Sequence, residues 1–174
     1  MPANRSPKKV LNRQTLVSLH LGIAPIWPAI EDVRNEIETL ILNLDKGNID
    51  FALIVLSELL ENAIKYGSKE ERLTGIILYF EANVDHICIK VKNPISQSMN
   101  LDSFKRVIEK IKTSEDKKAL HVERLLEIMN DPFQTESRLG LYRIVSECEY
   151  DLDFRLDDSG LEIIATKILK ASCN

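Results

Sequence analysis

The segment from residue 50 to residue 67 constrains the fold more than any other part of the sequence. Its apolar residues recur at helical spacing, and they are Leu53, Leu56, Leu60, Ala63 and Ile64. This pattern predicts a helix from about 50 to 66 with one apolar stripe facing a core. Gly67 is expected to end the helix in the left-handed conformation that glycine adopts at little cost.

The same predicted helix carries polar side chains of several chemical types. Glu58 and Asn62 are four residues apart and therefore lie on one side of the helix, with Glu61 and Lys65 beside them. A solvated outer face explains such a pattern, and so does a functional site.

The nine residues from Glu58 to Tyr66 resemble the N-box of the GHKL (Bergerat-fold, histidine-kinase-like) ATP-binding domain. This superfamily includes histidine kinases, gyrase and the serine kinases that act as anti-sigma factors. The resemblance implies that Asn62 holds Mg²⁺ against the nucleotide phosphates, that Glu58 is or orients the general base, and that Lys65 offsets phosphate charge. Mg²⁺ accepts a carboxamide oxygen beside phosphates and waters, and a carboxylate can accept a proton from a hydroxyl group.

A second box of the superfamily, Asp-x-Gly-x-Gly, recognises adenine and corresponds to residues 93–97. Asn93 stands in place of the Asp, while Ile95 and Gln97 replace the two glycines. The amide oxygen of Asn93 can still accept a hydrogen bond from an adenine amino group. Ile95, however, disfavours positive φ and close backbone approach to a nucleotide. The alternative is that Asn93-Pro94 only ends a strand.

A third box, Gly-x-Gly-Leu-x-Ile-Val, corresponds to residues 138–145 at the start of a predicted helix. Gly140 and Leu141 keep the family residues, and Arg138 precedes them. Backbone amides at a helix N-terminus can bind phosphate oxygens, and Arg138 can add a charge-assisted contact. The alternative is a helix that merely packs through its apolar residues.

The remaining patterns complete an α/β chain. The sequence predicts a strand at 15–21, a helix at 27–44, a hairpin of 75–81 and 86–92, two helices within an insertion at about 95–138, a helix from 139, and a hairpin of 150–156 and 161–168. This order predicts a two-layer sandwich, a mixed sheet with helices on one face. It is also the element order of the GHKL fold.

The length of 174 residues suits one domain, at 14–174, after a flexible basic tail at 1–13. A net charge of −4 and a pI near 5.5 argue against nucleic acid as a partner. No apolar run approaches the roughly 20 residues of a membrane span, and no signal peptide is evident. Three cysteines without CxxC spacing favour free thiols. We therefore expect a cytoplasmic protein without membrane or nucleic-acid contacts.

The insertion occupies the place of the family's ATP lid. The chain looks similar to anti-sigma-factor kinases and to the SiaB-like threonine kinases of bacterial partner-switching systems. A lid of helices departs from the anti-sigma-factor kinases and looks more like the SiaB-like subgroup. The resemblance implies ATP and Mg²⁺ as cofactors. It also implies a small regulatory protein of the anti-sigma-factor-antagonist type, or a sigma factor, as partner, and a homodimer in some members.

Two functional hypotheses remain open for this freestanding module. One is an ATP-dependent serine/threonine protein kinase, or a regulator of the same kind that acts by binding. The other is a pseudo-ATPase that has lost nucleotide binding and docks a protein partner, for which the two lid helices are a candidate surface. In the lid, Phe104, Leu125 and Met129 are expected to lie mostly in the core.

Overall fold

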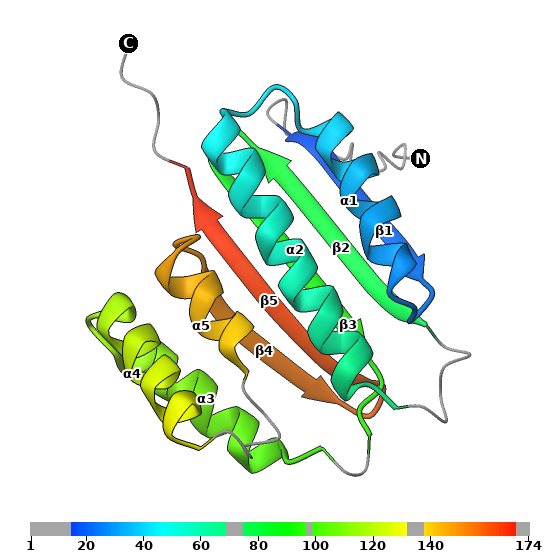
Figure 1. Cartoon of the computed structure of the whole chain (residues 1–174). Helices are drawn as coiled ribbons and strands as arrows, with labels where there is room; N and C mark the ends of the chain where they lie inside the picture. The colour runs from blue at the N-terminus through cyan, green and yellow to red at the C-terminus, as the bar shows by residue number, and fades with distance from the viewer. Residues whose placement is uncertain (1–14, 69–74, 97–98, 132–137, 170–174) are drawn as a thin grey trace, which may run out of the picture.

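A computed structural model describes residues 15–68, 75–96, 99–131 and 138–169 (Figure 1). The elements in chain order are β1 (Thr15–Ile23), α1 (Pro28–Leu40), α2 (Lys46–Tyr66), β2 (Ile76–Asn83), β3 (His86–Asn93), α3 (Leu101–Thr113), α4 (Lys117–Asn130), α5 (Leu139–Ser146), β4 (Asp151–Asp157) and β5 (Gly160–Ile168). Every strand and helix expected from the sequence is present. The N-terminal tail at 1–13 lies outside the described residues.

The five strands form one sheet in the order β1-β2-β3-β5-β4, and each neighbouring pair is antiparallel. The expected mixed sheet is therefore wrong in strand direction. Two pairs are hairpins, and β1 is joined to β2 through two helices, α1 and α2. Parallel neighbours are usually joined by one crossover helix, so a connection through two helices returns the chain antiparallel.

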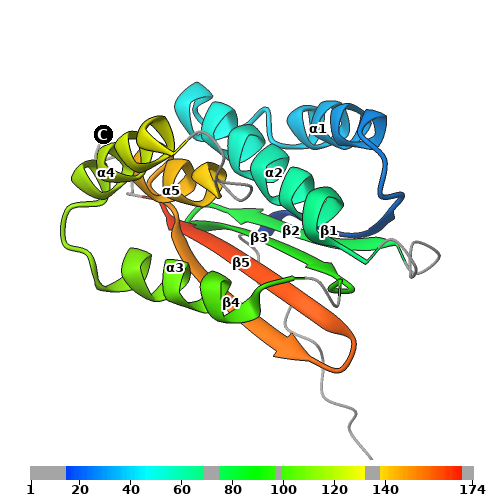
Figure 2. The same ribbon diagram turned by 60° about the horizontal axis from the view of Figure 1, so that its bottom comes forward.

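The helices form the second layer, as expected. Figure 2 shows α1, α2, α5 and α4 on one side of the sheet, with α3 alongside β4. Helix α2 supplies the centre of the core, where Leu56, Leu59 and Leu60 are completely buried. Alternate residues of β3 face it, and Ile87 and Ile89 are likewise buried. The two-layer α/β sandwich is thus confirmed.

The ends of α2 hold this helix in register with the sheet. Asp45 caps its first turn by accepting a hydrogen bond from the Asn48 amide at 3.0 Å. Gly67 ends it, but in an extended conformation with φ −67°, so the left-handed conformation expected from the sequence is wrong. Glycine is required for space instead, because a Cβ at this position would lie 2.5 Å from the Ala63 carbonyl oxygen. A bridge from Gly67 to Ile95 then brings the end of α2 beside the end of β3.

Helix α3 belongs to the folded core. Phe104, Ile108 and Ile111 lie on one side of the helix and are buried. The Phe104 ring packs edge-on against Phe154 of β4, with the ring centres 5.4 Å apart. The prediction for Phe104 is therefore confirmed.

Helix α4 packs against α5 and buries only Leu120. Leu125 and Met129, which the sequence placed mostly in the core, are 39% and 75% exposed. This prediction is wrong because helical spacing shows that an apolar stripe exists and does not show what covers it.

Candidate functional site

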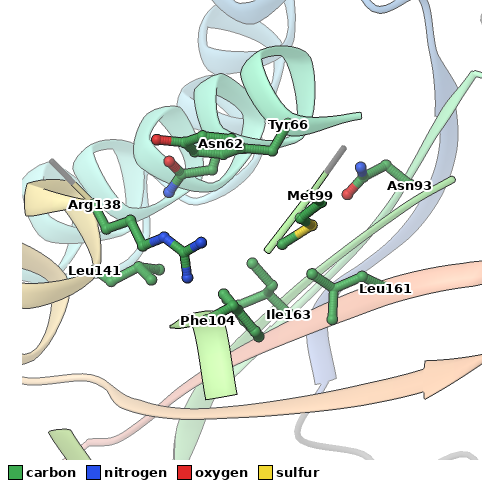
Figure 3. A pocket seen from close by; sticks show the side chains of 9 residues that line it. All are labelled: Asn62, Tyr66, Asn93, Met99, Phe104, Arg138, Leu141, Leu161 and Ile163. Carbon is green, nitrogen blue, oxygen red and sulfur yellow. The ribbon is translucent and has the colours of Figure 1, made fainter. Parts of the chain in front are cut away.

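A small pocket lies where the end of α2, the end of β3, the start of β5 and the start of α5 meet α3 (Figure 3). Nine residues line it, and they are Asn62, Tyr66, Asn93, Met99, Phe104, Arg138, Leu141, Leu161 and Ile163. The lining is mostly apolar, with two carboxamides and one guanidinium among its polar groups. The space left between the side chains holds about one water molecule.

Asn62 is the polar residue that α2 contributes to the pocket. Its Nδ2 atom is buried and has no hydrogen-bond partner within the described part of the chain. A buried amide left without a partner costs about 1–3 kcal/mol. Such a group in a native fold calls for an explanation, and a bound molecule supplies one.

Asn93 lies at the opposite edge of the pocket, at the end of β3. It is buried, and its Nδ2 atom donates to the Pro94 carbonyl oxygen at 3.1 Å. Figure 3 shows its amide beside Met99, at the margin of the cavity. Asn93 thus ends the strand and also lines the pocket. Its role in ending the strand therefore does not exclude a contact with a molecule in the pocket.

Arg138 fills much of the pocket. It precedes α5 with φ 46° and ψ 21°, a left-handed backbone, and its side chain is buried. The guanidinium lies 6.0 Å from the centre of the Tyr66 ring and 5.6 Å from that of Phe104. Its Nη2 atom donates to the Asn100 carbonyl oxygen at 3.3 Å. The family box has a glycine two residues before Gly140, and here an arginine keeps the backbone that glycine adopts easily.

Glu58 lies one turn before Asn62 and faces α5, outside the pocket lining. A Cβ atom at Gly140 would come within 2.1 Å of Glu58 Oε2, so this glycine makes room for the carboxylate. Arg143 Nη1 donates to Glu58 Oε1 at 3.2 Å. The hydrogen bonds that Arg143 donates, first to Glu147 and second to Glu58, raise the pKa of Arg143 above its ordinary value.

Arg143 is not among the site residues that the sequence predicted. A signal for it exists, because Arg143 follows Gly140 by three residues and therefore lies near the same face of α5. Once Gly140 is known to contact Glu58, a cation on that face is a natural partner for the carboxylate.

Two other residues that the resemblance assigned to nucleotide binding lie outside the pocket lining. Lys65 Nζ pairs with Glu61 at 3.3 Å, and its side chain is half exposed. Ile95 pairs with Gly67 and packs beside the core. Leu141 does line the pocket, whereas Gln97 lies outside the described residues.

The donor chemistry of the pocket suits a nucleotide, but its present size does not. The amide of Asn62, the guanidinium of Arg138 and the start of α5 are groups whose hydrogen bonds phosphate oxygens accept. No cluster of three His, Cys, Asp or Glu side chains suited to a metal occurs among the described residues. An Mg²⁺ ion at Asn62 would therefore take its other ligands from phosphates and water. Arg138 must move before a nucleotide can enter.

Comparison with known proteins shows a likeness to a solved structure. No protein-family model and no curated protein matches the sequence. Among solved structures, a chain in the crystal structure of the SiaB–SiaC complex from Pseudomonas aeruginosa is similar, with a TM-score of 0.62 and 16% sequence identity. The likeness covers 90% of this chain and 90% of that chain. At this identity it shows the α/β fold of the chain. No described helix is long and apolar enough to cross a membrane.

Proposed function

We propose that this protein is a regulatory module that binds ATP in the pocket around Asn62 and acts on a small partner protein. The observation that carries the proposal is the buried Asn62 amide, which has no partner among the described residues and lies beside a guanidinium. The similar structure is a complex of SiaB with SiaC, which supports a protein partner for this chain. The N-box resemblance supports the nucleotide.

In this proposal each residue around the pocket has a separate role. Asn62, Arg138 and the backbone amides of Gly140 and Leu141 would hold the phosphates with Mg²⁺, and Asn93 would face the adenine. Bound ATP would supply the phosphoryl group for a serine or threonine of the partner. Transfer of this kind depends mostly on positioning and charge stabilisation. Glu58 would accept or orient the hydroxyl proton, for which it must give up its contact with Arg143.

Calorimetric titration with ADP and a non-hydrolysable ATP analogue, with and without Mg²⁺, tests the nucleotide site. We expect Mg²⁺-dependent binding by the native protein and its loss in Asn62→Ala, with the circular dichroism spectrum unchanged. Glu61→Gln is the matched control, because Glu61 is the neighbouring residue on α2 and makes only a half-exposed ion pair. Unchanged binding by Asn62→Ala would remove Asn62 from the site.

A second candidate function is a docking module that has lost ATP. The closed pocket and the ion pair between Glu58 and Arg143 favour it. Arg138→Gly separates the two functions, since it restores the family residue and vacates the pocket. The ATP-binding function predicts nucleotide binding by this variant in a thermal-shift assay. If neither the native protein nor Arg138→Gly responds to millimolar nucleotide, the ATP-binding function is excluded and docking is the function to test.

A further inference from the structure

The Glu58 carboxylate lies where an anion is favoured, beside the start of α5. Its Oε2 atom takes the space that a Cβ atom of Gly140 would need, and its Oε1 atom accepts from Arg143 Nη1 at 3.2 Å. Gly140 belongs to the first turn of α5, where the helix dipole favours negative charge. A carboxylate of α2 therefore sits between the start of α5 and a guanidinium.

Arg143 is held by two carboxylates, and one of them is easier to replace. Its Nε atom donates to Glu147 Oε2 at 2.9 Å, within the same helix. Its contact with Glu58 joins two helices through side chains that are 43% and 21% exposed, and a partly exposed ion pair stabilises a fold little. A stronger anion can therefore displace Glu58 while Glu147 keeps the guanidinium in place.

Three residues of the proposed site follow one another along α2, in the order Asn93, Asn62 and Glu58. Asn93 Nδ2 lies 3.2 Å from the position of a Cβ atom at Gly67, where the helix ends. Asn62 precedes Gly67 by five residues, and Glu58 precedes Asn62 by four. Figure 1 shows α5 beside α2. A nucleotide with its adenine at Asn93 and its inner phosphates at Asn62 therefore directs its terminal phosphate toward Glu58.

We propose that Arg143 recognises the terminal phosphate of a nucleoside triphosphate, and that this phosphate takes the place of the Glu58 carboxylate. The inference rests on the nucleotide site proposed above. A phosphate carries more negative charge than a carboxylate and accepts paired hydrogen bonds from a guanidinium, so the exchange is favourable. A diphosphate ends short of Arg143 and leaves the ion pair with Glu58 closed.

The exchange has two consequences for the site. Arg143 becomes the residue that distinguishes a triphosphate from a diphosphate. Glu58 becomes free only when the phosphate to be transferred is present, and it then faces the hydroxyl proton that the proposed function assigns to it. The ion pair seen in the structure is thus the resting state of the site.

Calorimetric titration in the presence of Mg²⁺ tests Arg143 with ADP and a non-hydrolysable ATP analogue. The native protein should bind the analogue more tightly than ADP. Arg143→Gln should weaken binding of the analogue about 10–100-fold, as expected for a hydrogen bond between charged groups, and should change binding of ADP by less than about twofold. Arg143→Lys keeps the charge without the paired donors and should give an intermediate loss.

A matched control removes the same charge elsewhere. Arg155 is an exposed residue of β4 outside the pocket lining, and its Nη1 atom lies 3.8 Å from Glu162. Arg155→Gln should bind both nucleotides like the native protein. The ³¹P resonance of the terminal phosphorus of the bound analogue should differ between the native protein and Arg143→Gln, while that of the innermost phosphorus should coincide.

Glu58→Gln tests the exchange itself. Arg143 then has no ion pair to give up, so the analogue should bind about 2–5-fold more tightly, and binding of ADP should stay unchanged. Weaker binding of the analogue by Glu58→Gln overturns the exchange.

The remaining outcomes separate this inference from the proposed function. Equal losses of ADP and analogue binding in Arg143→Gln would mean that Arg143 only supports the shape of the site, which overturns the inference. A native protein that binds both nucleotides equally overturns it as well, and the nucleotide site itself stands. A native protein that binds neither nucleotide overturns the proposed function and the inference together.

Discussion

At the scale of single residues, the contact between Glu58 and Gly140 links the two helices of the site. Glu58 Oε2 occupies the space that a Cβ atom of residue 140 would need, and Oε1 of the same carboxylate accepts from Arg143. A larger side chain at position 140 must therefore displace the carboxylate of Glu58, which belongs to a different helix.

Gly140→Ala should raise the free energy of unfolding in one background and not in the other. In the native protein it displaces the Glu58 carboxylate, so the free energy of unfolding should stay level or fall by up to about 1 kcal/mol, the scale of a partly exposed ion pair. In a Glu58→Ala background the obstruction is gone. There the same change should raise the free energy of unfolding by about 0.5–1 kcal/mol, because alanine suits a helix better than glycine. Urea unfolding of the native protein, the two single variants and the double variant measures both effects. Equal changes in the free energy of unfolding in the two backgrounds would disprove the contact.

The sequence predicted part of the candidate site. Three separate motifs contributed Asn62, Asn93, Arg138 and Leu141, and the structure brings these four into one pocket. The position of the Lys65 ammonium group could not be predicted from residue spacing. A long, flexible side chain pairs with a nearby carboxylate, and here that carboxylate is Glu61. The closure of the pocket by Arg138 depends on ring contacts between distant segments, which no local pattern reveals.

At the scale of elements, α3 is a structural helix. In a mobile lid, replacing one side chain by a smaller one would change the free energy of unfolding little. The buried residues of α3, in contrast, pack against β4, so a smaller side chain there should lower the free energy of unfolding. The N-cap Asn100 fixes the start of α3 by accepting a hydrogen bond from the Ser103 amide at 2.9 Å.

Ile108→Ala therefore tests whether α3 is part of the core. Ile108 is 1% exposed, and truncating a buried isoleucine to alanine costs about 2–5 kcal/mol. Lys105→Ala, at an exposed position of the same helix, should change the free energy of unfolding by less than about 0.5 kcal/mol. Urea denaturation distinguishes the two, and a small effect at Ile108 would mean that α3 moves as a lid.

Element type was more predictable than element direction and surroundings. The alternation in residues 86–92 was sufficient to identify a strand, because it reflects one buried face. Whether β1 runs parallel or antiparallel to β2 depends on how many helices join them, which the patterns of single elements do not decide. The apolar stripe of α4 has the same period whether it faces a core or solvent.

At the scale of the whole molecule, three buried acids make the fold sensitive to alkali. Burial raises the pKa of the Cys148 thiol from its ordinary value of 9.0 to about 11, and burial also raises the pKa of the Tyr142 and Tyr150 hydroxyls. The folded protein therefore keeps these protons at a pH where the unfolded chain releases them.

Between neutral pH and about pH 9 the thiol should leave stability unchanged, and stability should fall as the pH rises toward 11. The thiol alone accounts for about 2 kcal/mol at the upper end, since one pKa unit corresponds to about 1.36 kcal/mol. Urea unfolding at a series of pH values from neutral to about 11 measures the slope. Cys148→Ala should reduce the slope, and an unchanged slope in that variant would assign the alkaline sensitivity to other groups.

The pairing of β3 with β5 has a consequence for synthesis of the protein on the ribosome. Asn93 pairs with Leu161 and His86 with Ile168, so the inner edge of β3 has no partner until the chain beyond residue 168 has emerged. Until then Ile87 and Ile89 belong to an open sheet edge, a template for pairing with other chains. The nascent protein must therefore carry an aggregation-prone edge while residues 94–168 are made, and cotranslational chaperones would find their target there.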